Sequence, residues 1–247
     1  MEKQKIWTED HCVGFHEVDF SGQMHLHSLF NYFQEAAWNH AGDTGFGFDF
    51  VTEKKMAWVI FQVDVEIIKY PKWLSKVKVK TWPCRINRLF AEREYMIVDK
   101  EDNIYVKCSS QWLIIDMDSR KPIRPYMLSS FQECLVDNKL LTQNKIKLDE
   151  DFTIVSEHEY QVQYSDIDVN GHANNSKYVE WIFNHCYQLL EAGRPERFSI
   201  NFISESRLKE KVKLELYNRG DEYICIGKSI DRDKTLYIAK FDLALPK

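Results

Sequence analysis

Three polar side chains stand at alternate positions just before a stretch with helical periodicity. They are Asp168, Asn170 and His172, which offer a carboxylate, a carboxamide and an imidazole. In an extended segment, alternate side chains point to the same side, so these groups can converge on one small volume. The helix that follows would direct free backbone N–H groups and the positive end of its dipole to the same place. The spacing therefore predicts an active site.

The same segment also has a purely structural interpretation. An Asx-rich turn could cap the following helix, with Asn174 or Asn175 at the N-cap position. Two further features favour an active site over a simple cap. A carboxylate, Glu205, follows further along the chain, and the segment recurs in altered form near the amino terminus.

The altered copy belongs to a longer repeat. Residues 15–23 align with 164–172, residues 65–79 with 200–214, and residues 99–106 with 231–238. Matches that follow one another in the same order indicate two copies of one unit. The first copy keeps an aspartate and a glycine of the segment but lacks its reactive groups. Ser21, Gln23 and Tyr70 stand there opposite Asn170, His172 and Glu205.

Each copy has the pattern of a long amphipathic helix followed by strands. The first helix has an apolar stripe, ended by glycines, formed by Leu26, Leu29, Phe30, Phe33, Ala36, Ala37 and Ala41, before Gly42, Gly45 and Gly47. The second has a similar stripe formed by Tyr178, Ile182, Cys186, Leu189 and Leu190, before Gly193 and Pro195. Alternating apolar residues predict strands at 61–67, 77–81, 212–216 and 237–241. The sequence therefore predicts an α+β fold, in which an antiparallel sheet wraps a long helix in each of two tandem units.

The chain of 247 residues is long enough for these two units and no third domain. We place the units at residues 1–127 and 156–247. Residues 128–155 are polar and weakly periodic, which is typical of a connector that crosses the surface.

Composition indicates a protein of a reducing cytoplasm, without membrane attachment. The amino terminus lacks an apolar signal region, and no run approaches the roughly 18 apolar residues of a membrane span. The six cysteines show no CxxC pair, so we expect free thiols and neither a metal site nor a cofactor. His25 and His27 lack a nearby third ligand, and packing explains them better than a metal.

The formal net charge of −5 gives no overall field that would attract nucleic acid. Lys76, Lys78 and Lys80 alternate with valines, which is typical of the solvated face of a strand. A second interpretation groups these lysines into a basic patch that could receive an acidic partner protein, together with Lys69, Lys72, Arg85 and Arg88.

The Asp-x-Asn-x-His-x-Asn-Asn stretch, ahead of a tyrosine-containing helix and a later glutamate, resembles the acyl-acyl-carrier-protein thioesterases of bacteria and plant plastids. The resemblance covers most of the chain, and the absence of a transit peptide favours the bacterial branch. In the first half it includes, in family order, Gln34–Ala37, Gly45–Gly47, Trp58, Tyr70–Trp73, Thr81–Trp82, Arg93–Tyr95 and Trp112 through Asp116 to Arg120, and in the second half Asp168–Tyr178, Trp181 and Glu205.

This resemblance implies a double hot-dog enzyme that hydrolyses the thioester of a fatty acyl chain on acyl carrier protein. Its polar centre would be formed by Asp168, Asn170, His172 and Glu205. The chemically silent first unit would bind the acyl chain through Leu29, Phe30 and Phe33, and Asn174 and Asn175 would contact the substrate at the polar centre.

Thioester chemistry suits these groups, because a thiol with a pKa of about 8.5 leaves readily and needs no strong general acid. An activated water and a site for the oxyanion are still required. Glu205 is the candidate base, and we expect it to be buried among Ile200, Phe202 and Ile203. His172 and backbone amides would stabilise the oxyanion, Asn170 would orient the water or the substrate, and Asp168 would hold the loop. Either Glu205 or His172 could be the base, and the residue pattern leaves this open.

Family members often carry a cysteine directly after this glutamate, whereas Ser206 stands here. Unless Cys186 or Cys225 folds into the site, direct attack by water is favoured over a covalent cysteine mechanism. Ser206 lacks the GxSxG surroundings of a serine nucleophile.

The residue pattern leaves two other functions open. An acyl-CoA hydrolase would use the same polar centre, and the discriminator is whether the entrance recognises a carrier protein or an adenine nucleotide. A non-enzymatic acyl-binding sensor would keep the apolar pocket without the polar centre. Two units in one chain can pair with each other, so both a monomer and a homodimer fit the pattern.

Overall fold

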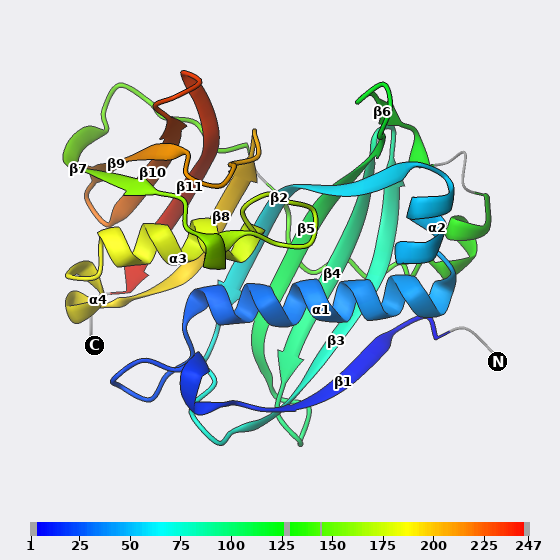
Figure 1. The fold of residues 1–247 in the computed structure, drawn as a ribbon. Helices are drawn as coiled ribbons and strands as arrows, with labels where there is room; N and C mark the ends of the chain where they lie inside the picture. Colours follow the sequence, from blue (N-terminus) through cyan, green and yellow to red (C-terminus); the bar gives the residue numbers. More distant parts are fainter. Residues whose placement is uncertain (1–3, 126–128, 144, 245–247) are drawn as a thin grey trace. The chain divides into compact units, whose positions relative to one another are not determined.

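The computed structural model describes residues 4–125, 129–143 and 145–244. The chain divides into two compact units, Met1–Gln143 and Asn144–Lys247. Within each unit, antiparallel strands lie side by side and a helix packs on them (Figure 1). The predicted α+β double hot-dog class is therefore confirmed.

In the first unit the strands lie in the order β1-β3-β4-β5-β2, with β6 paired to β5. Each pair of neighbouring strands in this order is antiparallel, as is the pair β5 and β6. The long helix α1 lies across this sheet (Figure 1). The elements are β1 (Trp7–Cys12), η1 (Phe15–Glu17), α1 (Leu26–Thr44), α2 (Phe48–Glu53), β2 (Met56–Ile67), β3 (Lys76–Asn87), β4 (Phe90–Val98), β5 (Ile104–Asp116), β6 (Pro122–Ile123) and η3 (Ser129–Cys134).

The second unit repeats this arrangement. Its strands lie in the order β7-β9-β10-β11-β8, again antiparallel. Each of these strands takes the place of one strand of the first unit, in the same sequence order. The elements are β7 (Thr153–Gln161), η4 (Tyr164–Asp166), α3 (Asn175–His185), α4 (Leu189–Ala192), β8 (Arg194–Phe202), β9 (Lys211–Arg219), β10 (Glu222–Ser229) and β11 (Lys234–Ala244).

The predicted apolar stripe of α1 is its buried face. Leu29, Phe33 and Ala36 are almost fully buried. The helix ends at Gly45, whose φ of 84° gives the left-handed C-cap that glycine favours. Gly42 lies inside the helix instead of ending it, because a single glycine costs a helix only about 1 kcal/mol relative to alanine.

The second helix is shorter than the sequence predicts. α3 stops at His185, and Cys186 forms its C-cap with φ −112° and ψ 29°. Leu189 and Leu190 belong to the separate short helix α4. The break could not be predicted because Cys186 and Leu189 keep helical spacing across it.

No helix within the described residues combines the length and apolar character that a membrane span requires.

The strands bury the residues that alternation predicts. Val77 and Val79 on β3, and Val212 and Leu214 on β9, are fully or almost fully buried. Lys76 points to solvent, and Lys80 forms a 2.6 Å ion pair with Asp102.

Much of the predicted connector at 128–155 is ordered into the two units. Trp82 Nε1 donates to the carbonyl of Asn138 at 2.8 Å, and the N–H of Leu140 donates to Glu94 Oε2 at 3.0 Å. Phe131 packs edge-on against Phe46. The second unit already forms strand β7 from Thr153. Residues 126–128 and 144, which include one predicted boundary, lie outside the described residues, as do 1–3 and 245–247.

Backbone pairing corrects one of the three repeat alignments. The N–H of Ile68 donates to Tyr105 O, and the N–H of the equivalent Ile203 donates to Leu236 O. Tyr105 therefore corresponds to Leu236, not to Tyr237 as the alignment of 99–106 with 231–238 implies. A shift by one residue exchanges the two faces of a strand, which explains why Tyr237 is fully buried and Tyr105 is not.

Candidate active site

The segment that carries the candidate residues is a tight loop, not the extended strand that the alternate spacing suggested. The N–H of Asp168 donates to His172 O at 2.9 Å, and the N–H of Gly171 donates to Asp168 O at 3.0 Å. Gly171 has a φ of 77°, a left-handed conformation that glycine adopts without strain. Asp168 Oδ1 accepts the N–H of Asn170 at 2.8 Å. Asp168 thus holds the loop, as predicted, while Asn170 is exposed at its tip.

The loop brings His172 to Glu205. His172 Nε2 lies 3.3 Å from Glu205 Oε1, and their side chains are 29% and 33% exposed. Glu205 comes from the turn between β8 and β9, and this turn is tied to the loop because the N–H of Ala173 donates to Ser206 O at 3.0 Å. An imidazole and a carboxylate that are in contact and each about one-third exposed can both meet a substrate from solvent.

The expected apolar burial of Glu205 is wrong. Its side chain is one-third exposed, and its predicted neighbour Ile203 is 56% exposed. The turn lifts residues 203–205 away from the core after β8 ends at Phe202.

The capping interpretation also holds, alongside the candidate site. Asn174 is the N-cap of α3, and its Oδ1 accepts the N–H and the O–H of Ser176, each at 2.9 Å. Asn175 is the first helical residue and is half-buried. The cap anchors α3 directly after His172, so the positive end of the helix dipole lies beside the loop.

The first unit contains the same loop without the reactive pair. The N–H of Asp19 donates to Gln23 O at 3.0 Å, the N–H of Gly22 donates to Asp19 O at 2.9 Å, and the φ of Gly22 is 72°. The N–H of Met24 donates to Pro71 O at 2.8 Å, as that of Ala173 does to Ser206 O. Gln23 and Tyr70 therefore occupy the positions of His172 and Glu205. The backbone is conserved between the units, and only the chemistry differs.

The two cysteines that could have supplied a nucleophile are buried in the second unit. Burial raises the pKa of Cys186 to about 12, and it raises the pKa of Cys225 well above its ordinary value. Cys186 Sγ donates to Ile182 O at 3.0 Å. Ser206 is also fully buried, and among the described residues no histidine or carboxylate is hydrogen-bonded to its hydroxyl. These three side chains lack the exposure and activation of a nucleophile.

Thiol alkylation should therefore leave hydrolysis intact. Iodoacetamide should modify Cys12, the exposed cysteine on β1, and turnover should stay within about twofold of the untreated protein. The measurement is the rate of product release alongside mass-spectrometric mapping of the modified residues. Inactivation without unfolding, with substrate protecting one cysteine, would restore a cysteine mechanism. Ser206→Ala should likewise be nearly harmless, and an acyl-enzyme trapped on Ser206 would contradict this.

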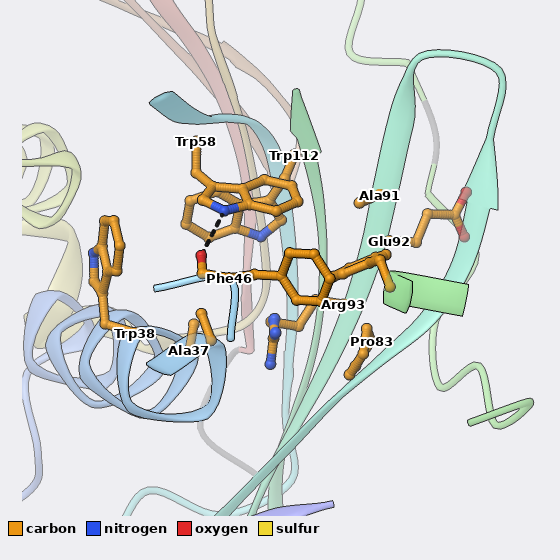
Figure 2. Close-up of a pocket in the computed structure, with 11 residues that line it drawn as sticks. Ala37, Trp38, Phe46, Trp58, Pro83, Ala91, Glu92, Arg93 and Trp112 are labelled. Carbon is orange, nitrogen blue, oxygen red and sulfur yellow. Dashed lines mark hydrogen bonds between the residues drawn. The ribbon is translucent and has the colours of Figure 1, made fainter. Parts of the chain in front are cut away.

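A small pocket, with a cavity volume of about 40 Å³, opens between α1 and the sheet of the first unit (Figure 2). Trp58 and Trp112 lie over it, and Trp58 Nε1 donates to Phe46 O at 3.2 Å. Most of its lining is apolar and comes from Ala37, Trp38, Ala41, Phe46, Trp58, Pro83, Ala91, Glu92, Arg93, Trp112 and Phe131. An apolar pocket with a few polar groups is typical of small-ligand sites.

The pocket lies further along α1 than the residues predicted to bind an acyl chain. Leu29, Phe30 and Phe33 are buried on α1, and the Phe33 ring packs 5.0 Å from that of Tyr95. The lining begins one helical turn later, at Ala37. The sequence did carry a signal for this offset, because the stripe changes from large side chains at Leu29, Phe30 and Phe33 to small ones at Ala37 and Ala41.

A buried histidine fixes the arginine that lines this pocket. His40 Nδ1 lies 3.0 Å from Arg93 Nη1, and its Nε2 lies 2.7 Å from the carbonyl of Gln4. Arginine can only donate and a carbonyl can only accept, so His40 carries its proton on Nε2 and is neutral. Burial, reinforced by the charge of Arg93, lowers the pKa of His40 to about 4.

Acidification should destabilise the first unit through His40. The unfolded chain binds a proton at His40 below a pH of about 6.5, whereas the folded chain resists it down to about 4. Stability should therefore fall between these values, by up to about 1.4 kcal/mol per pH unit. His40→Gln should flatten this part of the profile, measured by urea unfolding at a series of pH values. If the free energy of unfolding changes with pH equally in the parent and in His40→Gln, His40 has the same pKa in the folded and the unfolded chain, which would contradict this prediction.

Comparison with known proteins assigns the chain to a family. Residues 4–126 match the model of the acyl-ACP thioesterase N-terminal domain, and residues 149–239 match that of the C-terminal domain. An oleoyl-acyl carrier protein thioesterase of Coriandrum sativum is 28% identical over 248 residues, covering 91% of this chain and 66% of the relative. A palmitoyl-acyl carrier protein thioesterase of Arabidopsis thaliana is 27% identical over 194 residues, covering 72% and 46%. The chain spans about half the length of several such curated relatives.

Solved structures agree with the sequence matches. The acyl-ACP thioesterase from Bacteroides thetaiotaomicron superimposes with a TM-score of 0.87 at 26% identity, over 97% of this chain and 98% of that chain. The 12:0-ACP thioesterase from Umbellularia californica shares the fold, with a TM-score of 0.87 at 20% identity over 98% of each chain. With both domain models matched in order and a full-length structural relative, this chain belongs to the acyl-ACP thioesterase family.

Proposed function

We propose that this chain hydrolyses the thioester bond of a fatty acyl chain carried by acyl carrier protein. The observation that carries the proposal is the 3.3 Å contact between His172 Nε2 and Glu205 Oε1. The first unit has the same loop but carries Gln23 and Tyr70 at these positions. Because the loop forms without this pair in the first unit, its presence in the second supports a role in the reaction.

Glu205 activates the water in this proposal. The carboxylate accepts a proton from water as the water oxygen bonds to the thioester carbonyl carbon, and the carbonyl electron pair moves onto oxygen. With its proton on Nε2, His172 donates to Glu205 Oε1 and holds the carboxylate in position. That proton is then engaged with Glu205, so the oxyanion falls to the Asn170 amide, with the positive end of the α3 dipole beside it.

The carbon–sulfur bond breaks when the oxyanion collapses. The electron pair leaves on sulfur, and the resulting thiolate takes the proton that Glu205 received from water. The products are a free fatty acid and the thiol of the carrier, and Glu205 returns to its ionised form. Because a thiolate is a good leaving group, no separate strong acid is needed.

Carrier protein is the proposed acyl donor because the family and its matched relatives are named for it. The pocket beneath Trp58 and Trp112 is the proposed site for the acyl chain, since it is an apolar cavity on the unit that lacks the reactive pair. Asn174 and Asn175 remain proposed substrate contacts. The capping role of Asn174 Oδ1 leaves its amide nitrogen for such a contact.

The proposal is tested by measuring fatty-acid release from acyl chains of graded length on carrier protein and on coenzyme A. Faster turnover of the carrier-protein series at equal concentration would support the proposed donor. Preference for the coenzyme A series would favour the acyl-CoA hydrolase that the sequence left open. Tight acyl binding without release from either series would leave a binding protein and exclude the hydrolase.

A further inference from the structure

The peptide bond between Glu205 and Ser206 is held at both of its polar atoms by side chains. Its carbonyl oxygen accepts from Arg232 Nη2 at 2.5 Å. Its N–H, which belongs to Ser206, donates to the hydroxyl oxygen of Tyr178 at 2.8 Å. The orientation of this peptide sets the direction in which the Glu205 side chain leaves the backbone.

Arg232 is in turn held by a buried carboxylate. Its Nε donates to Glu210 Oε1 at 2.6 Å, and the N–H of Arg207 donates to Glu210 Oε2 at 2.8 Å. Ser229 Oγ makes a further short hydrogen bond to Glu210 Oε1. Burial alone would raise the pKa of Glu210, but these hydrogen bonds and the charge of Arg232 outweigh it and hold the pKa below its ordinary value. Glu210 therefore stays ionised, and Arg232 keeps one position.

Tyr178 connects the peptide to the helix that follows His172. It lies on α3, is 2% exposed, and packs its ring against those of Trp181, Phe202 and Tyr237. A side chain fixed by three aromatic neighbours has little freedom to move its hydroxyl. Ser206 O also accepts the N–H of Ala173 at 3.0 Å, so one hydrogen bond joins the turn to the His172 loop and another joins it to α3.

The first unit lacks these contacts although it keeps the backbone. Leu29 stands at the position of Tyr178, and Pro71, which has no N–H, stands at that of Ser206. Ser75 replaces Glu210 and accepts the N–H of Lys72 at 3.2 Å, as Glu210 does that of Arg207. Glu101 replaces Arg232, since each precedes a left-handed aspartate, Asp102 or Asp233. The contacts thus accompany the reactive pair and are not needed to form the turn.

We infer that Tyr178, Arg232 and Glu210 form a clamp on the Glu205–Ser206 peptide that positions Glu205 against His172. Tyr178 and Arg232 hold the peptide directly, and Glu210 acts through Arg232. None of the three need touch the substrate, so they are positioning residues. This inference rests on the proposed function only in that Glu205 and His172 are its reacting pair.

Ser206→Pro gives the sharpest test, because it removes the clamped N–H while the equivalent turn of the first unit already accommodates proline. Ser206→Ala keeps the N–H and serves as its control. Tyr178→Phe removes only the hydroxyl. Arg232→Gln removes the charge, and Glu101→Gln is its matched control in the first unit.

We expect Ser206→Pro, Tyr178→Phe and Arg232→Gln each to lower kcat by about tenfold to a hundredfold with little change in KM, as expected for a misplaced group. Arg232→Lys should recover part of this loss.

A second measurement is independent of turnover. Nitrogen-15 NMR of the His172 ring at fixed pH should show a change of chemical shift on Glu205→Gln, because the carboxylate contact is lost. The clamp variants Ser206→Pro, Tyr178→Phe and Arg232→Gln should shift the same signals in the same direction. The control variants Ser206→Ala and Glu101→Gln should not. Unshifted His172 signals in folded clamp variants would overturn the clamp even if the parent chain hydrolyses thioesters. Shifted signals in a chain without thioesterase activity would keep the clamp and reject the proposed function.

Discussion

Replacing His172 or Glu205 by alanine should lower turnover by about a hundredfold or more, the scale of losing one positioned catalytic group. Each replacement removes one partner of the 3.3 Å contact. Without Glu205, water lacks its proton acceptor, and without His172, the carboxylate loses the donor that holds it. Asn170→Ala should cause a loss of similar scale, because the exposed loop tip would no longer offer an amide to the oxyanion. The measurement is kcat and KM on one acyl-carrier-protein substrate.

The first unit supplies the matched control. Gln23→Ala changes the position equivalent to His172 in a loop with the same hydrogen bonds. We expect its turnover to stay within about twofold of the parent, since it carries no proposed catalytic role. Thermal unfolding of each variant separates lost chemistry from lost structure. Near-parent activity of folded His172→Ala and Glu205→Ala proteins would eliminate the site.

Chain-length preference should move in opposite directions when the pocket of the first unit is filled or enlarged. Ala37→Leu adds side-chain volume to the lining, and Phe131→Ala removes an aromatic ring from it. Each methylene group of the acyl chain that enters or leaves the pocket changes the transfer free energy by about 0.8 kcal/mol. This corresponds to about a fourfold change in relative kcat/KM. A shift of two methylenes should therefore alter the preference about fifteenfold. Competition between acyl chains of different length, followed by analysis of the released acids, measures this ratio.

The second helix provides the control for this pair. Cys186, the C-cap of α3, aligns in the repeat with Ala37 of α1, so Cys186→Ala should leave the product profile unchanged. Phe30→Ala and Phe33→Ala, at the positions predicted from the sequence, show whether the chain extends along α1 beyond this pocket. Phe131→Ala should also cost about 3–5 kcal/mol of stability, as is usual for a buried aromatic. Unchanged profiles for Ala37→Leu and Phe131→Ala, with a shift for Cys186→Ala, would move the acyl chain to the second unit.

The fold was predictable because its signals are periodic and occur twice. The alternation in β3 and β9 and the stripe of α1 each reflect a buried face, and the repeat gave an independent check on both. The third alignment failed by one residue because Ile-Tyr-Val and Leu-Tyr-Ile look alike in sequence. The hydrogen bonds of Ile68 and Ile203 and the registers of the paired strands separate the two alignments.

The sequence predicted which residues form the candidate site better than it predicted their arrangement. The spacing of Asp168, Asn170 and His172 suggested a strand, but Gly171 permits the turn that places Asp168 against the backbone and Asn170 at the tip. The burial of Glu205 was overestimated because its apolar neighbours in sequence belong to the end of β8. Arg232 could not be connected to Glu205 from sequence, since their contact depends on how two loops fold.

The presence of both loops in one chain affects how each loop can evolve. In a pair of identical subunits, one mutation alters every copy of the loop, so a residue needed for chemistry cannot be exchanged in one copy alone. Here residues 15–24 and 164–173 are encoded by separate stretches of a single gene. Substitutions at Gln23 or Tyr70 can therefore accumulate without altering His172 or Glu205. The first loop is free to change in response to selection on the ligand, while selection on the reaction retains the second.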